Sequence, residues 1–227
     1  MEVIAGRNDV RAATALRLMH ADEHLLVLDK PDGLLSVPGR GAAKADCLSA
    51  RVQAQYHDAL IVHRLDMATS GLIVMARGAD MQRRLNRAFA AREVDKRYVA
   101  VVVGLPQPPA AAGGWGVIDL PIAADWPNRP LRIIERERGQ ASVTRWRVLA
   151  RDEAAATARL ELEPVTGRSH QLRVHLKAIG HPILGDALYA PPAIAAAAPR
   201  LLLHASQLRL AHPASGAAME FFSPTPF

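Results

Sequence analysis

The chain has 227 residues and half of them are hydrophobic, so it can fold around a sizeable core, which excludes a disordered tail. Its formal net charge is +6 and its cations are mostly arginines, a balance that suits a polyanionic partner such as nucleic acid. Only 4% of the residues are aromatic, which argues against a surface that stacks successive bases of a single strand.

The single cysteine and the lengths of the apolar segments indicate where the protein resides and which structural features it lacks. The one cysteine, Cys47, excludes an internal disulfide and a cysteine metal cluster, and we expect it to be a small hydrophobic residue at a helix start. The N-terminal residues carry no long apolar run, and no later segment is long enough to span a bilayer. We therefore expect a cytoplasmic protein, with one domain over residues 1–227 and a weakly patterned lead-in over residues 1–20.

The first predicted elements are a strand and a helix joined by an irregular segment. Residues 25–28 form a short apolar strand, which a Pro-Asp-Gly turn ends after Lys30. Residues 34–40 read as an irregular loop. Asp46 is then placed to cap a helix that runs to about Tyr56.

A polar cluster stands directly in front of a continuous apolar run in the next segment. Residues 63–66 read His-Arg-Leu-Asp, and residues 72–76 have the length and composition of a buried strand. Thr-Ser-Gly at 69–71 supplies turn chemistry between the two. Asp66 therefore lies at the mouth of a core strand. It is either a turn-capping group or a reactive group held rigidly at a cleft, and composition alone favours the first.

The middle of the chain predicts a basic helix, a strand and two loops. Residues 78–91 form an amphipathic helix whose arginines point away from its apolar stripe, and residues 96–104 form a second strong strand. The loop over residues 106–114, rich in Pro, Ala and Gly, is the best candidate for a mobile segment. Residues 125–130 form a rigid polar segment that carries one tryptophan and Arg129.

The last third of the chain is rich in strands. Residues 140–150 and 158–163 alternate between apolar and polar side chains and predict a hairpin. Residues 201–205 and 219–222 are further strands. Strands with a few interspersed helices indicate an α+β fold with an antiparallel or mixed sheet.

Several kinds of chemistry can be excluded from spacing. His170 and His175 are five residues apart, which places their side chains on different sides of a helix or on opposite faces of a strand. They are therefore not placed to bind one metal ion together, and we predict no metal site. Ser70 and Ser169 lie in no Gly-x-Ser-x-Gly context, and no Walker-type phosphate loop is present. The candidate reactive groups that remain are a carboxylate, a phenol and an arginine.

Five sequence words follow one another in order from about residue 22 to the C-terminus. The words are Lys30-Pro31-Asp32-Gly33-Leu34, His63-Arg64-Leu65-Asp66 followed by Thr69-Ser70-Gly71, Lys96-Arg97-Tyr98, the run from Thr166-Gly167-Arg168 to Val174-His175, and Gly180-His181-Pro182-Ile183 with Gly185-Asp186. Together they resemble the RluA family of pseudouridine synthases. The chain departs from many family members in having no S4-type RNA-binding domain before Leu25.

The resemblance implies a fold, an activity and a partner. The fold is the pseudouridine synthase fold, α+β with a mixed, largely antiparallel sheet and flanking helices and loops. The activity is the isomerisation of specific uridines to pseudouridine in structured RNA, with no cofactor. The implied substrates are uridines in the tRNA anticodon loop and in a 23S rRNA stem-loop, and the expected state is a monomer without metal or membrane contacts.

The resemblance also assigns residues. Asp66 matches the catalytic aspartate, as nucleophile or as stabiliser of positive charge at the sugar. Arg168 matches the arginine that pairs with this carboxylate and opposes its protonation by desolvation. Tyr98 matches the tyrosine that lies against the target base, and Arg64 matches the group that fills the gap left by an extruded base. The further expected RNA contacts are His63, Arg129, His170 and Arg173.

Two other functions compete with this interpretation. A noncatalytic RNA-binding or ribosome-assembly protein explains the positive charge but not a carboxylate among cations. A glycoside hydrolase or nucleosidase needs a second carboxylate about 5–10 Å from the first. Glu161, Glu163 and Asp186 are the plausible partners for Asp66 in that chemistry.

Overall fold

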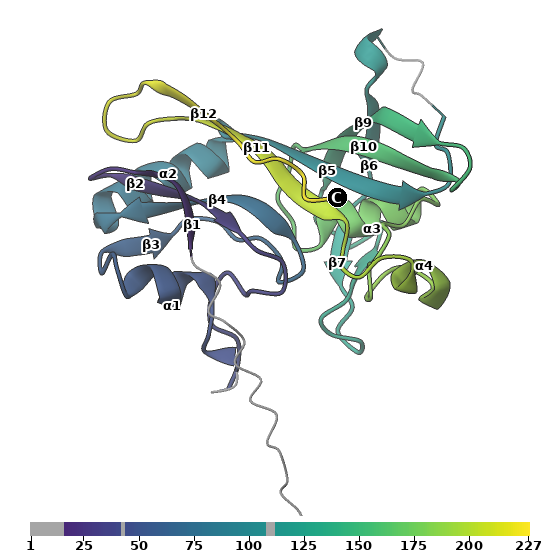
Figure 1. Ribbon diagram of the computed structural model, residues 1–227, viewed down its shortest axis with the longest axis horizontal. Coiled ribbons are helices and arrows are strands. Elements are labelled where there is room, and N and C mark those ends of the chain that lie inside the picture. Colours follow the sequence, from purple (N-terminus) through teal and green to yellow (C-terminus); the bar gives the residue numbers. More distant parts are fainter. Residues whose placement is uncertain (1–15, 42–43, 108–111) are drawn as a thin grey trace, which may run out of the picture.

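A long mixed sheet runs through the molecule (Figure 1). The computed structural model describes residues 16–41, 44–107 and 112–227. Within these residues the strands are β1 Arg17–Ala21, β2 Leu25–Lys30, β3 Ala59–Ile61, β4 Ser70–Arg77, β5 Asp95–Val103, β6 Gly116–Asp119, β7 Ile122–Ala124, β8 Arg132–Ile134, β9 Val143–Asp152, β10 Thr157–Pro164, β11 Leu203–Ala211 and β12 Ala218–Phe222. The helices are α1 Leu48–Gln53, α2 Gly78–Ala91, α3 Gln171–Ala178 and α4 Pro192–Ala196, with a short 3-10 turn, η2, at Ala112–Gly114.

The strand order is β1-β2-β4-β11-β5-β10-β9-β6, with β3 paired to β4 and β12 paired to β11. In the described residues, every pairing between these strands is antiparallel except that of β4 with β11. The short strands β7 and β8 form a separate hairpin. The predicted α+β class with a mixed, largely antiparallel sheet is therefore confirmed.

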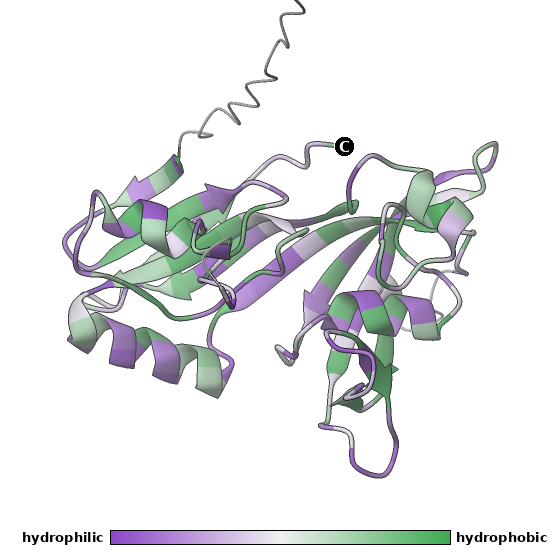
Figure 2. Cartoon of the chain, turned by 90° about the horizontal axis from the view of Figure 1, so that it is seen from below, coloured by the Kyte–Doolittle hydropathy of each residue, from purple (hydrophilic) through white to green (hydrophobic). Residues whose placement is uncertain are grey.

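The apolar run of β4 is continuous because both faces of the sheet are covered at this strand. Ile73 and Met75 pack into the larger core cluster, together with Leu26 and Leu28 of β2. Alternate residues of the same strands, such as Val74, pack into a second cluster on the opposite face, against the apolar side of α2. Figure 2 shows α2 with its polar and apolar residues segregated in this way. Burial on both sides removes the polar alternation that a half-exposed strand needs.

Gly71 allows β11 to lie directly beside β4. The backbone at Gly71 has φ +109°, and a Cβ built there would lie 2.3 Å from the carbonyl oxygen of Ala205. Gly71 pairs in register with Ala205 in the parallel part of the sheet. A side chain at this position would therefore separate the two strands just after the turn that carries Asp66.

The structure corrects two local predictions, and a third falls partly outside the described residues. The lead-in over residues 1–20 contains the start of β1, which pairs with β2. The first helix begins at Leu48 and is capped by Cys47, whose sulfur accepts the Ala50 N–H, because Asp46 is instead held by an ion pair with Arg51. The predicted mobile loop lies partly at residues 108–111, outside the described residues, and ends in η2.

The remaining predicted strands and the second helix are present. Residues 78–91 are α2, and β9 and β10 form the predicted hairpin. None of the helices in the described residues is long and apolar enough to cross a membrane.

Candidate active site

Asp66 lies in a tight turn at the start of β4. The Thr69 N–H donates to the Asp66 carbonyl at 3.1 Å, which closes the turn. The preceding residue is fixed from behind, because the Ser36 hydroxyl donates to the Leu65 carbonyl at 2.7 Å and accepts the Leu65 N–H at 3.1 Å. The carboxylate itself accepts no backbone N–H among the described residues, so the turn-capping role is wrong.

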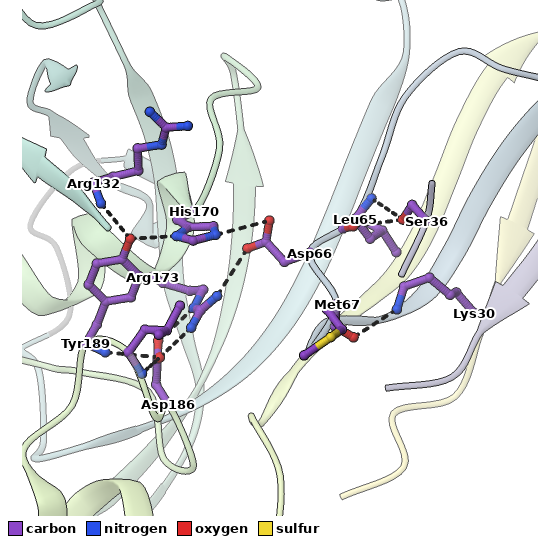
Figure 3. A network of polar contacts seen from close by, with 11 residues as sticks. Lys30, Ser36, Leu65, Asp66, Met67, Arg132, His170, Arg173, Asp186 and Tyr189 are labelled. Atoms are coloured by element: carbon purple, nitrogen blue, oxygen red, sulfur yellow. Dashed lines mark hydrogen bonds and ion pairs between the residues drawn. The ribbon is translucent and has the colours of Figure 1, made fainter. Parts of the chain in front are cut away.

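Lys30 anchors the same turn from the other side. Its side chain is fully buried, and its Nζ donates to the carbonyls of Pro31, Leu34 and Met67 at 2.8, 2.8 and 3.2 Å. Burial lowers the pKa of this ammonium to about 8. Three carbonyls around one cation tie the loop after β2 to the residue that follows Asp66, as Figure 3 shows for Met67. The Asp66 backbone is thus held from both sides.

A cavity of about 590 Å³ opens in front of Asp66. All the predicted site residues except Arg129 line it, although they come from three separate stretches of the chain. The lining includes His63, Arg64, Asp66, Tyr98, Arg168, His170 and Arg173. Three of the five sequence words are therefore brought together around one pocket, while Lys30 of the first word and Asp186 of the fifth support it from outside the lining.

Arg173 is the guanidinium that faces Asp66. Its Nη1 lies 3.4 Å from Asp66 Oδ2, while its Nε and Nη2 donate to the Asp186 carboxylate at 2.9 and 2.6 Å. Arg173 is 4% exposed and Asp186 is 1% exposed. The bidentate pair orients the guanidinium, so that its remaining edge points at Asp66 (Figure 3).

The expected ion pair between Asp66 and Arg168 is wrong. Arg168 lies in the exposed turn before α3, where its Nε donates to the Ala141 carbonyl at 3.4 Å and its backbone N–H donates to Gln171 Oε1 at 3.0 Å. Arg173 is the third residue of α3, in the buried part of the helix, and reaches Asp66 instead. The expectation that Arg173 contacts RNA phosphates is wrong for the same reason, because its guanidinium is buried between two carboxylates.

His170 approaches Asp66 from the residue before α3. Its Nε2 lies 3.8 Å from Asp66 Oδ1, and its Nδ1 lies 2.6 Å from the Tyr189 hydroxyl. That hydroxyl also accepts the backbone N–H of Arg132 at 2.9 Å. Tyr189 thus fixes the orientation of the ring, so that Nε2 faces Asp66. Burial lowers the pKa of His170, consistent with a neutral ring, and raises the pKa of Tyr189 to about 12.

Tyr98 and Arg64 line the cavity and keep their polar groups available. Tyr98 is a 9% exposed residue of β5, and its hydroxyl has no hydrogen-bond partner among the described residues. Burial, with a smaller effect from the Asp66 charge, raises the pKa of Tyr98, so the phenol stays protonated at neutral pH. Arg64 is exposed, and in the described structure its guanidinium makes no ion pair, so a salt bridge to Asp66 is absent.

His63 is a structural residue, which corrects its assignment as an RNA contact. Its Nε2 accepts the Val74 N–H at 3.0 Å, and its ring stacks on Phe89 with the centroids 4.6 Å apart. Burial, together with the charge of Lys96, lowers the pKa of His63 to about 3. A neutral ring brings no positive charge to attract a phosphate, and His63 serves to hold the backbone of β4.

Arg129 lies outside the cavity. Its guanidinium carbon lies 3.4 Å from the centre of the Trp126 ring, in the loop between β7 and β8. Trp126 is 69% exposed and lines a second pocket. Arg129 is therefore at a surface where it can meet RNA, but at a distance from the group around Asp66.

Two further carboxylates, Asp95 and Glu163, line the cavity. Glu163 forms ion pairs with Arg97 and Arg145, the latter at 3.0 Å, so it is not a free acid beside Asp66. Asp186 is held by Arg173 and does not line the cavity, and Glu161 is paired with Arg147. The three carboxylates expected as partners of Asp66 in glycoside hydrolysis are thus all engaged by arginines. No cluster of three or more His, Cys, Asp or Glu side chains in the described residues is arranged to hold a metal ion.

Two residues of the site are not predicted by the sequence pattern. Tyr189 carried no recognisable signal, although it lies three residues after Asp186, whose carboxylate accepts its backbone N–H at 3.2 Å. Lys30 belongs to the first sequence word, where the pattern indicates only a turn. A lysine between an apolar strand and a proline was the available indication that its charge is buried.

Comparisons with known proteins agree with this geometry. A family model described as RNA pseudouridylate synthase matches residues 24–178. The dual-specificity RNA pseudouridine synthase RluA of Escherichia coli K12 is 50% identical over 93% of this chain and 94% of its own, and RluA of Yersinia pestis is 48% identical over 90% and 96%. The solved structure of human RNA pseudouridylate synthase domain containing 1 is similar with a TM-score of 0.74, at 27% identity over 94% of this chain and 84% of its own.

These relatives cover nearly the whole chain, and the matched region holds Asp66, Tyr98, Arg168 and Arg173. The pocket, with its carboxylate, phenol and buried guanidinium, lies within that region. The chain therefore belongs to the RNA pseudouridine synthases of the RluA family and is an isomerase that acts on uridines in RNA.

Proposed function

We propose that this enzyme modifies two RNA substrates, a uridine in a tRNA anticodon stem-loop and a uridine in a 23S rRNA stem-loop. The support is the identity of about half of the residues to enzymes described as dual-specificity RNA pseudouridine synthases, over almost the full length of both chains. The net charge of +6 suits either RNA. A cavity of about 590 Å³ has room for one extruded nucleotide, not for a duplex.

We assign the reaction to Asp66. Pseudouridine formation breaks the bond between N1 of uracil and C1′ of the sugar, rotates the base and joins its C5 to C1′. The C5 proton then leaves, and N1 gains a proton, so no atom is added. A carboxylate beside C1′ either forms a bond to it or stabilises its positive charge. The contact between Asp66 and the Arg173 guanidinium is the observation that carries this proposal.

The neighbouring groups position Asp66 and the base. Arg173 supplies a countercharge from inside the protein, and the His170 ring lies 3.8 Å from the other carboxylate oxygen. Tyr98 presents a protonated hydroxyl without a protein partner, which suits a group that lies against the base and assists proton transfer at C5. Exposed Arg64 is placed at the mouth to occupy the gap in the RNA stack.

The test is pseudouridine formation in two RNAs with the purified full-length chain. An anticodon stem-loop and a 23S rRNA fragment are each incubated with enzyme, and modified positions are mapped. Dual specificity requires one modified uridine in each RNA. Modification of one RNA only would replace the proposal with a single-substrate enzyme, and modification of neither would overturn both assignments.

A further inference from the structure

A second pocket of about 560 Å³ adjoins the active-site cavity and is unused by the reaction. It lies between the β7–β8 hairpin and the residues before α3, and its lining includes Trp126, Arg132, Arg138, Arg168 and Ser169. Arg168 also lines the cavity around Asp66, and His170 of that cavity follows Ser169 in the chain. A ligand that spans both pockets therefore passes Arg168.

Arg132 is the group in this pocket that most needs a partner. Its Nε is buried and has no hydrogen-bond acceptor, and its guanidinium forms no ion pair in the described part of the chain. Figure 3 shows the side chain extending away from Tyr189 and from Asp66. A buried donor without an acceptor is costly unless a ligand supplies one. Arginine in such a position favours an anion with several oxygens, such as phosphate.

The charges around Arg132 favour the same ligand. Arg138 and Arg168 add two cations to the lining. The lining also holds two acidic residues, Asp125 and Glu135, which keep their charge while they accept N–H groups of Asn128 and Glu137. The pocket therefore offers more cationic than anionic groups to an incoming ligand.

Trp126 provides an aromatic surface beside these cations. It is 69% exposed even with the Arg129 guanidinium stacked on one face, which is unusual for so large an apolar side chain. An indole with a guanidinium on it makes a flat platform on which a nucleobase stacks well. Phosphate-binding cations and a base platform in one pocket define a nucleotide site.

We propose that this pocket binds one further unpaired nucleotide of the RNA loop, with its phosphate at Arg132 and its base on the Trp126–Arg129 platform. This inference rests on the proposed function and deepens it, because the same RNA then enters both pockets at once. The nucleotide outside the catalytic cavity fixes which uridine of a loop reaches Asp66. Substrate selection thus involves residues that take no part in the chemistry.

The first test is the kinetics of Trp126→Ala on an anticodon stem-loop RNA. Loss of one stacked base predicts a fall of about tenfold in kcat/KM, with the rate at saturating RNA retained. Trp126→Phe keeps a stacking ring and is expected to recover most of the loss. Phe222→Ala, which removes a 60% exposed aromatic side chain from β12, is the matched control and should change neither quantity.

The second test removes the base instead of the side chain. Stem-loops with an abasic site at each loop position other than the target are assayed with wild type and with Trp126→Ala. One abasic position should lower kcat/KM about tenfold in wild type and have no further effect in the variant. Losses that add at every position would overturn the site, because they would show that Trp126 only supports the hairpin.

The third test addresses the phosphate. Arg132→Gln should weaken RNA binding and reduce the slope of log Kd against log salt by about one, while Arg209→Gln, on an exposed position of β11, should leave both unchanged. An unchanged salt slope for Arg132→Gln would overturn the phosphate assignment. Pseudouridine formation by the wild type in the same assays distinguishes the two proposals. An inactive wild type would contradict the proposed function, whereas an active wild type with unaffected variants would contradict the second nucleotide site alone.

Discussion

Arg173 Nη1 and Asp66 Oδ2 lie 3.4 Å apart, although the two residues are separated by 107 positions in the chain. The contact joins the turn before β4 to helix α3, and Asp186 holds the guanidinium from the opposite side. The carboxylate assigned to catalysis is thus paired with a cation that is itself fixed. Neither an exposed lysine nor a mobile arginine gives the same control over geometry.

Replacement of Asp66 by asparagine should abolish pseudouridine formation while RNA affinity stays within about threefold of wild type. The amide fills the same space but can neither bond to C1′ nor balance its charge. The measurement is single-turnover conversion together with an RNA Kd. Asp80→Asn, on an exposed turn of α2, is the control. Substantial residual turnover in Asp66→Asn would remove Asp66 from the mechanism.

The two arginines of the fourth sequence word should behave differently when each is replaced by lysine. Arg173→Lys loses the fork that Asp186 holds, and we expect the single-turnover rate at saturating RNA to fall about a hundredfold. Arg168→Lys should weaken RNA binding while that rate is largely retained, because Arg168 does not contact Asp66. Thermal unfolding of both variants checks the fold. The opposite ranking of the two rates would restore Arg168 as the partner of Asp66.

Arg64→Ala should slow modification of an intact stem-loop without affecting the fold, since Arg64 is exposed and unpaired in the described structure. If the side chain fills the gap left by the target base, the single-turnover rate falls about tenfold. An RNA whose target uridine is already unstacked should be modified at nearly the wild-type rate. Equal losses on both RNAs would point to a role in chemistry and not in extrusion.

The free energy of unfolding should fall as the pH falls from 6.5 toward 3, partly because of His63. Burial lowers its pKa to about 3 in the folded chain, so between these values the unfolded state binds a proton that the folded state does not. His63→Gln should remove up to one proton, about 1.4 kcal/mol per pH unit, from the slope of stability against pH. Urea unfolding at several pH values gives that slope, and exposed His57→Gln serves as control. An unchanged slope in His63→Gln would mean that His63 titrates normally in the fold.

Gly71→Ala should destabilise the chain by about 3 kcal/mol, because the new Cβ would lie 2.3 Å from the Ala205 carbonyl oxygen. Gly33→Ala has a similar positive φ, +77°, but open space around the Cβ, and should cost only about 1 kcal/mol. Equilibrium unfolding of the pair separates the steric contact from the backbone strain. Equal losses would show that the β4–β11 approach adapts.

The local pattern of apolar and polar residues predicts most strands of the sheet, because a strand with buried residues shows either a continuous apolar run or a regular alternation. The run after Asp66 and the alternation in β9 and β10 are such cases. The short strands β7 and β8 carry three residues each, too few for a period to show. The cap of α1 was misassigned because Asp46 has a competing partner in Arg51, which only the folded geometry reveals.

The sequence words located the cavity but not the pairing inside it. Arg168 and Arg173 are five residues apart in one word, and sequence alone does not say which faces Asp66. The answer depends on where α3 begins, because Arg173 lies on its buried side while Arg168 precedes it. His63 was misassigned because adjacency to Arg64 and Asp66 says nothing of its ring, which turns to the backbone of β4.

The parallel pairing of β4 with β11 also has a consequence for the order in which the molecule is completed. β11 starts at Leu203 and lies between β4 and β5, which end 126 and 100 residues before it. In a chain growing on the ribosome, the strand that follows Asp66 and the strand that carries Tyr98 therefore have no common neighbour until the final segment emerges. The sheet beneath the active-site cavity is completed only at the end of translation.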